Sequence, residues 1–285
     1  MSDKKKSLLG AHVSVAGGYT NGLIQAEKIG ASVIQIFGSS PRQWKVRIPS
    51  RSQVEDFLSA KEKSLVSEVY LHAPYLINLG SPNKELYEKS VAQLTGHMQI
   101  GNMIKAKGVI FHVGSSVGTD KDVAMDQAVD GMRRILEKVS GDTALIMENS
   151  ASSKKLGVDF KELGDMLRKV DSERVKICFD TAHAFGAGLI DEYSEGKIEK
   201  LLEEFNSEIG LENLVAIHIN DSKAKTGTNV DRHENIGQGF IGRAGFKRLL
   251  ANKSLSGVDW ILEVPGFEGG GPDKKNMDIL RSLVK

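Results

Sequence analysis

The sequence predicts an α/β fold, a single-domain (β/α)8 or TIM barrel. Eight short apolar runs recur along its 285 residues, and amphipathic segments with helical spacing follow most of them. No glycine-, proline- or serine-rich linker cuts the chain, so we expect residues 1–285 to form one domain, with residues 1–7 as a flexible tail. An open, doubly wound sheet is the alternative, but no G-x-G-x-x-G motif follows the first run, which weakens it.

The predicted strands are short runs rich in apolar and β-branched residues, which is typical of buried parallel strands. In chain order they cover residues 8–13, 32–37, 69–72, 108–113, 143–147, 175–179, 214–219 and 260–264. Between them, apolar residues recur at helical spacing, for example over residues 84–105, 122–139, 159–170 and 198–209. A strand followed by a helix, repeated in this way through one chain, is the pattern of a closed barrel.

Composition excludes several classes of protein. With 40% hydrophobic and 26% charged residues the chain can bury a sizeable core, and it contains no apolar run long enough to cross a membrane. Its first six residues lack the apolar centre of a signal peptide, and its single cysteine, Cys178, excludes a disulfide framework. We therefore expect a cytoplasmic protein with no membrane partner. The formal net charge of +1 means that any nucleic-acid-binding surface must be local.

Seven of the eight predicted strands end in, or run directly into, a side chain that can bind a metal ion. The exception is the second strand, which ends at Phe37. In a closed parallel barrel the carboxyl ends of all strands meet on one face, so these side chains would share one basin. They are, in chain order, His12, His72, His112, Glu148, Asp180 with His183, His218 and Glu263.

The stretch from 214 to 237 adds two further candidate ligands. Its apolar strand leads to His218 and then into a polar loop that presents Asp231-Arg232-His233. In an extended segment, side chains two residues apart point the same way, so Asp231 and His233 can bind one cation together. Of the seven histidines in the chain, only His97, inside a helical segment, lies away from this pattern.

The main candidate ligands are five histidines and four carboxylates, a set that favours zinc, manganese or iron. Since a catalytic zinc takes about three protein ligands, nine could hold as many as three ions. Three divalent ions against four carboxylates leave the site about two units positive, which suits an anionic substrate. Multinuclear sites stabilise both oxygens of a displacement at phosphorus, so the residues predict phosphodiester hydrolysis. A sugar-phosphate isomerase or epimerase is the alternative, although the excess of histidine argues against it.

Several longer motifs are specific enough to indicate a family. They are Gly-Ala-His-Val-Ser at 10–14, Pro-Arg-Gln-Trp at 41–44, His-Ala-Pro-Tyr-Leu-Ile-Asn-Leu at 72–79, Asp-Thr-Ala-His-Ala-Phe-Gly-Ala-Gly at 180–188, His-Ile-Asn-Asp-Ser-Lys at 218–223 and Asp-Arg-His-Glu-Asn-Ile-Gly at 231–237. Over nearly its whole length the chain thereby resembles endonuclease IV, the zinc-dependent apurinic/apyrimidinic endonucleases of base excision repair. The departures are Gly-Ser-Ser-Pro at 38–41, Ala182 for a common cysteine and Val113 for a common proline, and none touches a ligand position.

The resemblance implies a DNA-repair endonuclease that hydrolyses the phosphodiester bond 5′ to abasic sites in duplex DNA. The products would carry a 3′-hydroxyl and a 5′-deoxyribose phosphate, and the enzyme would also remove 3′ blocking groups. We expect a monomer with three zinc ions per chain, manganese serving in part, and abasic or 3′-blocked double-stranded DNA as its partner. A protein that binds DNA damage without turnover is a further alternative, which would need a broken catalytic set that this sequence does not contain.

The resemblance also assigns residues to roles. Glu148 and Glu263 would be catalytic, with Glu148 bridging two ions and Glu263 orienting the nucleophile. The first zinc ion would be held by His72, His112 and Glu148, the second by Glu148, Asp180, His218 and Glu263, and the third by His183, Asp231 and His233.

Other residues of the resemblance would contact DNA or support the ligands. Arg42, Tyr75 and Leu76 would enter the minor groove or fill the gap left by the missing base. Lys223 and Lys225 are candidate phosphate contacts in the loop after the seventh strand. His12 would lie behind the ligands and hold another side chain in place.

Overall fold

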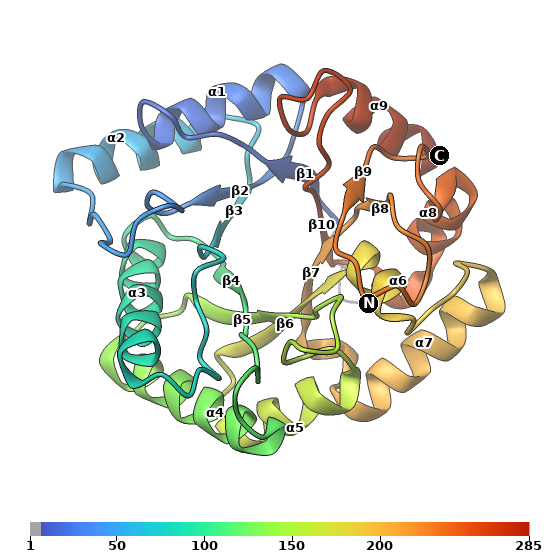
Figure 1. Ribbon diagram of the computed structural model, residues 1–285. Coiled ribbons are helices and arrows are strands. Elements are labelled where there is room, and N and C mark those ends of the chain that lie inside the picture. The colour runs from blue at the N-terminus through green and yellow to red at the C-terminus, as the bar shows by residue number, and fades with distance from the viewer. Residues whose placement is uncertain (1–6, 285) are drawn as a thin grey trace, which may run out of the picture.

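Eight parallel strands close into a barrel in the computed structural model, which describes residues 7–284 (Figure 1). Around the barrel the strands follow the order β1-β10-β7-β6-β5-β4-β3-β2, so neighbours in sequence are neighbours in space apart from the closure of β1 on β10. The predicted TIM barrel is confirmed; of the expected flexible tail, residues 1–6 lie outside the described residues. The strands are β1 (Leu9–His12), β2 (Val33–Phe37), β3 (Glu68–His72), β4 (Gly108–His112), β5 (Ala144–Glu148), β6 (Val175–Asp180), β7 (Leu214–His218) and β10 (Asp259–Leu262).

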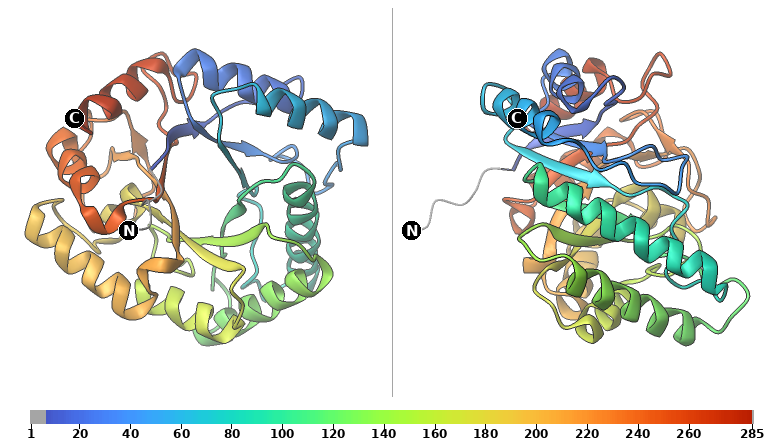
Figure 2. Two further views of the ribbon diagram at one scale, coloured as in Figure 1. Left: turned by 180° about the vertical axis from the view of Figure 1, so that it is seen from behind. Right: turned by 90° about the vertical axis from the view of Figure 1, so that its left-hand side faces the viewer.

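Helices surround the barrel, as the front, back and side views show (Figures 1 and 2). They are α1 (Tyr19–Ile29), α2 (Arg51–Glu62), α3 (Lys84–Met103), α4 (Lys121–Lys138), α5 (Phe160–Val170), α6 (Thr181–Ala187), α7 (Glu195–Glu208), α8 (Gly242–Ala251) and α9 (Lys274–Leu283). The four helical segments named from the sequence correspond to α3, α4, α5 and α7. A short hairpin, β8 (Asp221–Ser222) with β9 (His233–Glu234), follows β7. None of the helices in residues 7–284 combines the length and apolar character that crossing a membrane requires.

Several helices begin where a side chain caps the first free backbone N–H groups. The Asn83 side chain accepts a hydrogen bond from the Leu86 N–H before α3, and the Asp120 carboxylate accepts from two N–H groups before α4. Asp159 caps α5 in the same way, and Ser50 forms a capping box with Gln53 before α2. These caps fix the residues at which the loops before α2, α3, α4 and α5 end and their helices begin.

The alternation of side chains along the strands positions the site. Every second residue of a barrel strand points inward. The inner layer near the amino ends is apolar and fully buried, and comprises Val33, Tyr70, Ile110, Ile146, Cys178, Ala216 and Ile261. Two residues further along the same strands, or directly after them, stand Gln35, His72, His112, Glu148, Asp180, His218 and Glu263. A polar ring therefore lies directly above the apolar layer, at the carboxyl ends of the strands.

At the opposite end of the barrel, a buried carboxylate pairs with a partly exposed lysine. Asp259 is fully buried, and its Oδ2 accepts hydrogen bonds from Lys107 Nζ at 2.7 Å and from the Tyr70 hydroxyl at 2.8 Å. On β1, Gly10 lies so close to β2 that a Cβ there would stand 1.6 Å from the Val33 carbonyl oxygen. Only glycine permits this approach, which brings His12 beside the polar ring.

Candidate metal centre

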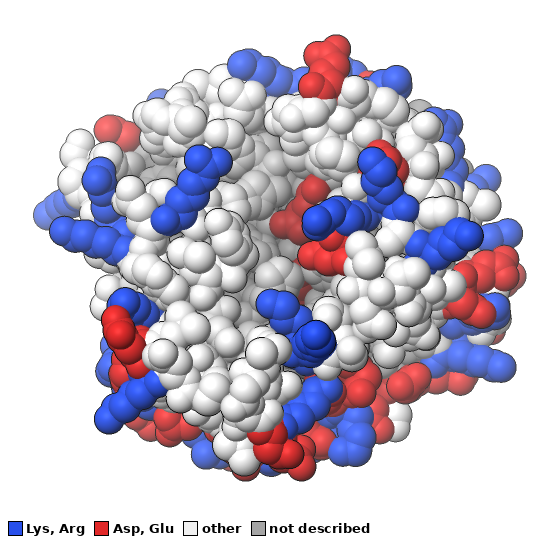
Figure 3. Space-filling view, in the orientation of Figure 1, with Lys and Arg blue, Asp and Glu red and all other residues white. Residues whose placement is uncertain are grey.

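The polar ring forms the floor of a hollow on the carboxyl face of the barrel. Figure 3 shows this hollow at the centre of the face, with Asp and Glu side chains in its wall and Lys and Arg side chains around its rim. Beside it, a groove of about 1090 Å³ runs from His12 between the loops after β1 and β2. Among the described residues, eight of the nine predicted ligands fall into three groups whose donor atoms lie within 4.8 Å of one another.

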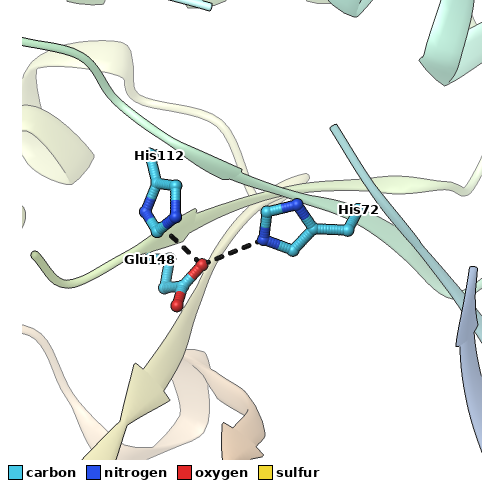
Figure 4. A group of neighbouring side chains, drawn as sticks. All are labelled: His72, His112 and Glu148. Atoms are coloured by element: carbon cyan, nitrogen blue, oxygen red, sulfur yellow. Dashed lines mark hydrogen bonds and ion pairs between the residues drawn. The ribbon is translucent and has the colours of Figure 1, made fainter. Parts of the chain in front are cut away.

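The first group is His72, His112 and Glu148, from the adjacent strands β3, β4 and β5. Both imidazoles approach the same carboxylate oxygen, as Figure 4 shows. Glu148 Oε2 lies 3.2 Å from His72 Nε2 and 3.6 Å from His112 Nδ1. Two ring nitrogens converging on one buried oxygen are the arrangement expected around a shared cation.

The second group uses the other oxygen of the same glutamate. His218 Nδ1 lies 3.0 Å from Glu148 Oε1, 3.2 Å from Glu263 Oε2 and 3.9 Å from Asp180 Oδ2. Glu148, Asp180 and His218 are fully buried, whereas the Glu263 side chain is 18% exposed. Glu148 thus faces both groups, and Glu263 is the carboxylate of its group with the greatest access to solvent.

The third group differs from the predicted one in its carboxylate. Asp180, His183 and His233 form it, whereas the sequence prediction paired the two histidines with Asp231. Asp231 nevertheless contacts both rings: its Oδ1 lies 3.3 Å from His183 Nε2 and 3.4 Å from His233 Nε2. Its side chain is 56% exposed because it stands on the loop before β9, above the buried Asp180. Asp180 therefore approaches the two histidines from the floor of the hollow, and Asp231 approaches them from its rim.

Backbone carbonyls fix the orientation of three of these histidines. The Nδ1 atoms of His72, His183 and His233 lie 2.7, 2.9 and 3.4 Å from the carbonyl oxygens of Ala73, Asn149 and Glu263. A carbonyl only accepts hydrogen bonds, so each ring carries a proton on Nδ1, and each Nε2 lies near a carboxylate oxygen; His183 Nδ1 also lies 3.2 Å from Glu148 Oε1.

The clustered charges oppose the effect of burial on ionisation. Burial alone would raise the pKa of the Glu148 carboxyl, but the surrounding histidines hold that pKa well below its ordinary value. Burial would likewise lower the pKa of His183, yet the negative charges of Asp180, Asp231 and Glu148 raise it well above its ordinary value. The basin therefore favours ionised carboxylates and attracts positive charge.

The donor set fits divalent metal ions. His233 Nε2 is buried and has no hydrogen-bond partner among residues 7–284, although it lies 3.6 Å from Asp180 Oδ2 and 3.4 Å from Asp231 Oδ1. A bare ring nitrogen between two carboxylate oxygens needs a proton or a cation to be satisfied. Imidazole nitrogens and carboxylate oxygens, with no thiolate among the three groups, suit zinc or manganese.

The remaining predicted residues lie outside these groups. His12 packs edge-on against Phe37, with ring centroids 4.5 Å apart, and its Nδ1 lies 3.6 Å from Glu263 Oε1. Arg42 is exposed on the loop after β2, and Tyr75 is 70% exposed on the loop after β3, with Leu76 partly exposed beside it. The loop lysines Lys223 and Lys225 are also exposed.

Three amides contact the predicted ligands although the sequence prediction named none of them. Asn220 donates to Asp180 Oδ2 at 2.7 Å and accepts from the Glu263 N–H at 2.8 Å. Asn149 accepts from the Asp180 N–H at 2.6 Å, and Gln35 bonds to two site residues. The signal that could have found Gln35 is its place two residues after Val33, which belongs to the inner apolar layer.

Comparisons with known proteins agree with this geometry. A family model described as a xylose isomerase-like TIM barrel matches residues 23–283. A protein named "Probable endonuclease 4" from Halothermothrix orenii is 36% identical over 275 residues, covering 96% of this chain and 99% of the relative. Another of that name, from Aquifex aeolicus, is 34% identical over 281 residues and covers 98% of each chain.

Solved structures separate the family from its wider fold. The crystal structure of endonuclease IV from Thermus thermophilus matches with a TM-score of 0.85 and 31% identity, over 97% of this chain and 98% of that one. A D-tagatose 3-epimerase-like protein matches with a TM-score of 0.71 but only 17% identity, over 97% of each chain, which shows the fold alone. The alternative of an isomerase or epimerase thus rests on a distant fold relative. The chain belongs to the endonuclease IV family of xylose isomerase-like TIM barrels.

Proposed function

We propose that this protein is a DNA-repair endonuclease that hydrolyses the phosphodiester bond 5′ to abasic sites in duplex DNA. The products carry a 3′-hydroxyl and a 5′-deoxyribose phosphate, and the same site removes 3′ blocking groups. The observation that carries the proposal is the ring of three donor groups in a chain of the endonuclease IV family. The buried Glu148 carboxylate contacts His72 of the first group with one oxygen and His218 of the second with the other. A carboxylate shared in this way suits a multinuclear phosphodiesterase.

Three zinc ions fit the three groups, with manganese able to take part of the positions. His72, His112 and Glu148 would hold the first, Glu148, Asp180, His218 and Glu263 the second, and His183, His233 and Asp231 the third, with Asp180 beside it. When bound, such ions neutralise the charge of the phosphate oxygens and allow water to act as a nucleophile near neutral pH.

Glu263 is the residue that we assign to orienting the attacking water. Its Oε1 accepts a hydrogen bond from Gln35 Nε2 at 2.5 Å, which holds the carboxylate in one orientation. Because the side chain is 18% exposed, its Oε2 faces the basin rather than a sealed core. A carboxylate held in this way can accept a proton from water and keep that water aimed at phosphorus. Glu148, fully buried, serves instead to bridge two ions.

Residues on the rim would bind the DNA. The Lys and Arg side chains around the hollow in Figure 3 give a local positive surface for phosphates, on a chain whose net charge is only +1. Tyr75 is 70% exposed on the loop after β3, with Leu76 partly exposed beside it, and these side chains can fill the gap left by a missing base, where unstacking costs least. Arg42 on the neighbouring loop would enter the minor groove, and Lys223 and Lys225 would contact phosphates.

The remaining expectations stand as proposals of the same function. Duplex DNA with abasic or 3′-blocked sites would be the partner, bound by a monomer in the cytoplasm. The whole chain would act as one domain, because the site draws residues from strands throughout the barrel.

The test is incision of a labelled duplex with a single abasic-site analogue, against an intact duplex, with metal content measured on the same sample. We expect one cut 5′ to the lesion and about three metal ions per chain. Glu263→Gln should lower the cutting rate about 10²- to 10⁴-fold, the range for a lost general base, and leave DNA binding within a few-fold. Glu268→Gln, an exposed carboxylate of the same β10–α9 loop, is the matched control.

Two outcomes would reject the proposal. A fully metal-loaded protein that cuts neither duplex would direct the search to sugar-phosphate isomerisation, which the same barrel supports in other proteins. Tight binding of the lesion without cutting by the unaltered protein would indicate a damage-binding protein. Retained cutting by Glu263→Gln would remove the role that we assign to Glu263.

A further inference from the structure

His218, like His112, presents Nδ1 to the basin carboxylates, which distinguishes these two from His72 and His233. His72, His183 and His233 each direct Nδ1 to a backbone carbonyl and turn Nε2 toward the carboxylates. In His218 the two nitrogens exchange places: Nδ1 lies within 3.9 Å of oxygens from Glu148, Asp180 and Glu263, and Nε2 points away from them. Something other than the backbone must therefore set its orientation.

The side chain of Gln35, on β2, accepts the hydrogen bond from His218 Nε2. Gln35 is fully buried, and its Oε1 lies 2.8 Å from His218 Nε2. Its Nε2 donates to Glu263 Oε1 at 2.5 Å and lies 2.9 Å from His12 Nδ1. The amide thus connects three site residues from three strands and directly bonds two of the predicted metal ligands.

Hydrogen-bonding rules determine which way this amide faces. An ionised Glu263 only accepts hydrogen bonds, so the Gln35 atom against it must be the NH2 group. The carbonyl oxygen then faces His218 Nε2, and that nitrogen must carry a proton to donate. His12 Nδ1, against the second N–H of Gln35, must accept. Each polar atom of the buried amide has a partner, so Gln35 is satisfied in one orientation only.

We propose that Gln35 is a positioning residue for the second metal ion, which makes His218 present Nδ1 and Glu263 present Oε2. The Gln35 carbonyl fixes a proton on His218 Nε2, as backbone carbonyls fix a proton on Nδ1 of His72, His183 and His233. Its NH2 group occupies one oxygen of Glu263 and leaves the other to the basin. His12 acts through Gln35 by accepting its second N–H. The inference rests on the proposed metal-dependent function and adds a residue to it.

The test measures metal binding and histidine tautomers, neither of which requires DNA. Gln35→Met keeps the side chain's length and removes its hydrogen bonds to His218, Glu263 and His12. We expect the affinity of one of the three ions, measured by chelator competition with zinc, to fall about 10- to 100-fold, the usual effect of losing such a support. Gln127→Met, on α4 and away from the basin, is the matched control and should change no metal affinity.

Nitrogen NMR of imidazole-labelled, zinc-loaded protein provides the signature that a merely structural role would not change. The unaltered protein should show two metal-bound histidines protonated on Nε2, His112 and His218, beside others protonated on Nδ1, and Gln35→Met should change the pattern of His218 and leave that of His112. Gln35→Glu keeps an acceptor for His218 but no donor for Glu263, so it should keep the pattern while still weakening the second ion. If Gln35→Met does not fold, the zinc affinity of Gln35→Glu tests the inference by itself.

Unchanged zinc affinity together with an unchanged tautomer pattern in folded Gln35→Met would overturn the inference. So would a Gln35→Glu variant that binds the second ion as tightly as the unaltered protein. These outcomes differ from a failure of the proposed function, in which the unaltered protein binds metals with the expected tautomers but does not cut DNA.

Discussion

Asp221 should hold the loop that carries His233, one of the three side chains of the third group. This carboxylate is fully buried at the start of β8, and β8 pairs with β9, which begins at His233. We predict that Asp221→Asn loosens the loop and weakens metal binding by His183 and His233 while the barrel stays folded. Asp221 accepts hydrogen bonds from the backbone N–H groups of Ser222, Gly237, Gly239, Ile241 and Gly242, at 2.8 to 3.4 Å.

The expected loss of affinity depends on which of the two Asp221 oxygens each N–H group contacts. Gly237 and Gly239 donate to Oδ2, while Ser222 and Ile241 donate to Oδ1. In either orientation the asparagine NH2 group would face two N–H donors, each of which costs about 1–3 kcal/mol when left unpaired. Burial raises the pKa of Asp221 even though the backbone N–H groups lower it. The ionised carboxylate is therefore stabilised by less than the sum of its hydrogen bonds. We therefore expect the low end, about 2 kcal/mol, or about 30-fold in affinity for the third ion.

The assay is chelator competition for bound zinc, with urea unfolding of the same preparations. Asp191→Asn, at an exposed carboxylate paired with Lys197, is the matched control and should change neither quantity measurably. An Asp221→Asn variant that keeps all its ions at unaltered affinity would show that this carboxylate does not hold the loop. A loss shared equally by all the ions would instead indicate general unfolding.

Three further predictions concern the barrel and its charge. Gly10→Ala should leave little folded protein in a solubility and circular dichroism comparison, because its Cβ would overlap the Val33 carbonyl oxygen; folded, fully metal-loaded protein would contradict this. Lys107→Met should lower the free energy of unfolding by about 2–3 kcal/mol, since it leaves buried Asp259 with Tyr70 alone, and an unchanged urea midpoint would refute it. Removing metal with a chelator should lower the melting temperature, because the four basin carboxylates then lose their neutralising charge. Added zinc should restore it. A melting temperature unaffected by chelation would count against the metal centre.

Much of the site could be predicted because barrel strands impose a period of two. A residue such as Ile146 faces the axis, so Glu148, two residues later, must do so as well, one layer nearer the carboxyl face. The recurrence of apolar runs ending in His, Asp or Glu therefore predicted both the barrel and the ring of ligands before any coordinates. Asp231 and His233 were predicted to act together for the same reason, and one carboxylate oxygen does contact both His183 and His233.

The tertiary structure decided the membership of the third group. Asp180 joins His183 and His233, which the resemblance had assigned to Asp231, because its strand ends beneath the loop that carries Asp231. Which nitrogen His218 presents depends on Gln35, which is 183 positions away in the chain. A sequence shows that a glutamine lies in an apolar run, but not which buried partners satisfy it. Residue types and their period are local properties, so the sequence by itself predicted the barrel and most of the side chains that meet in the basin. Hydrogen-bond partners between strands are set only by the closure of the barrel, and so the membership of the third group and the orientation of these side chains were decided there.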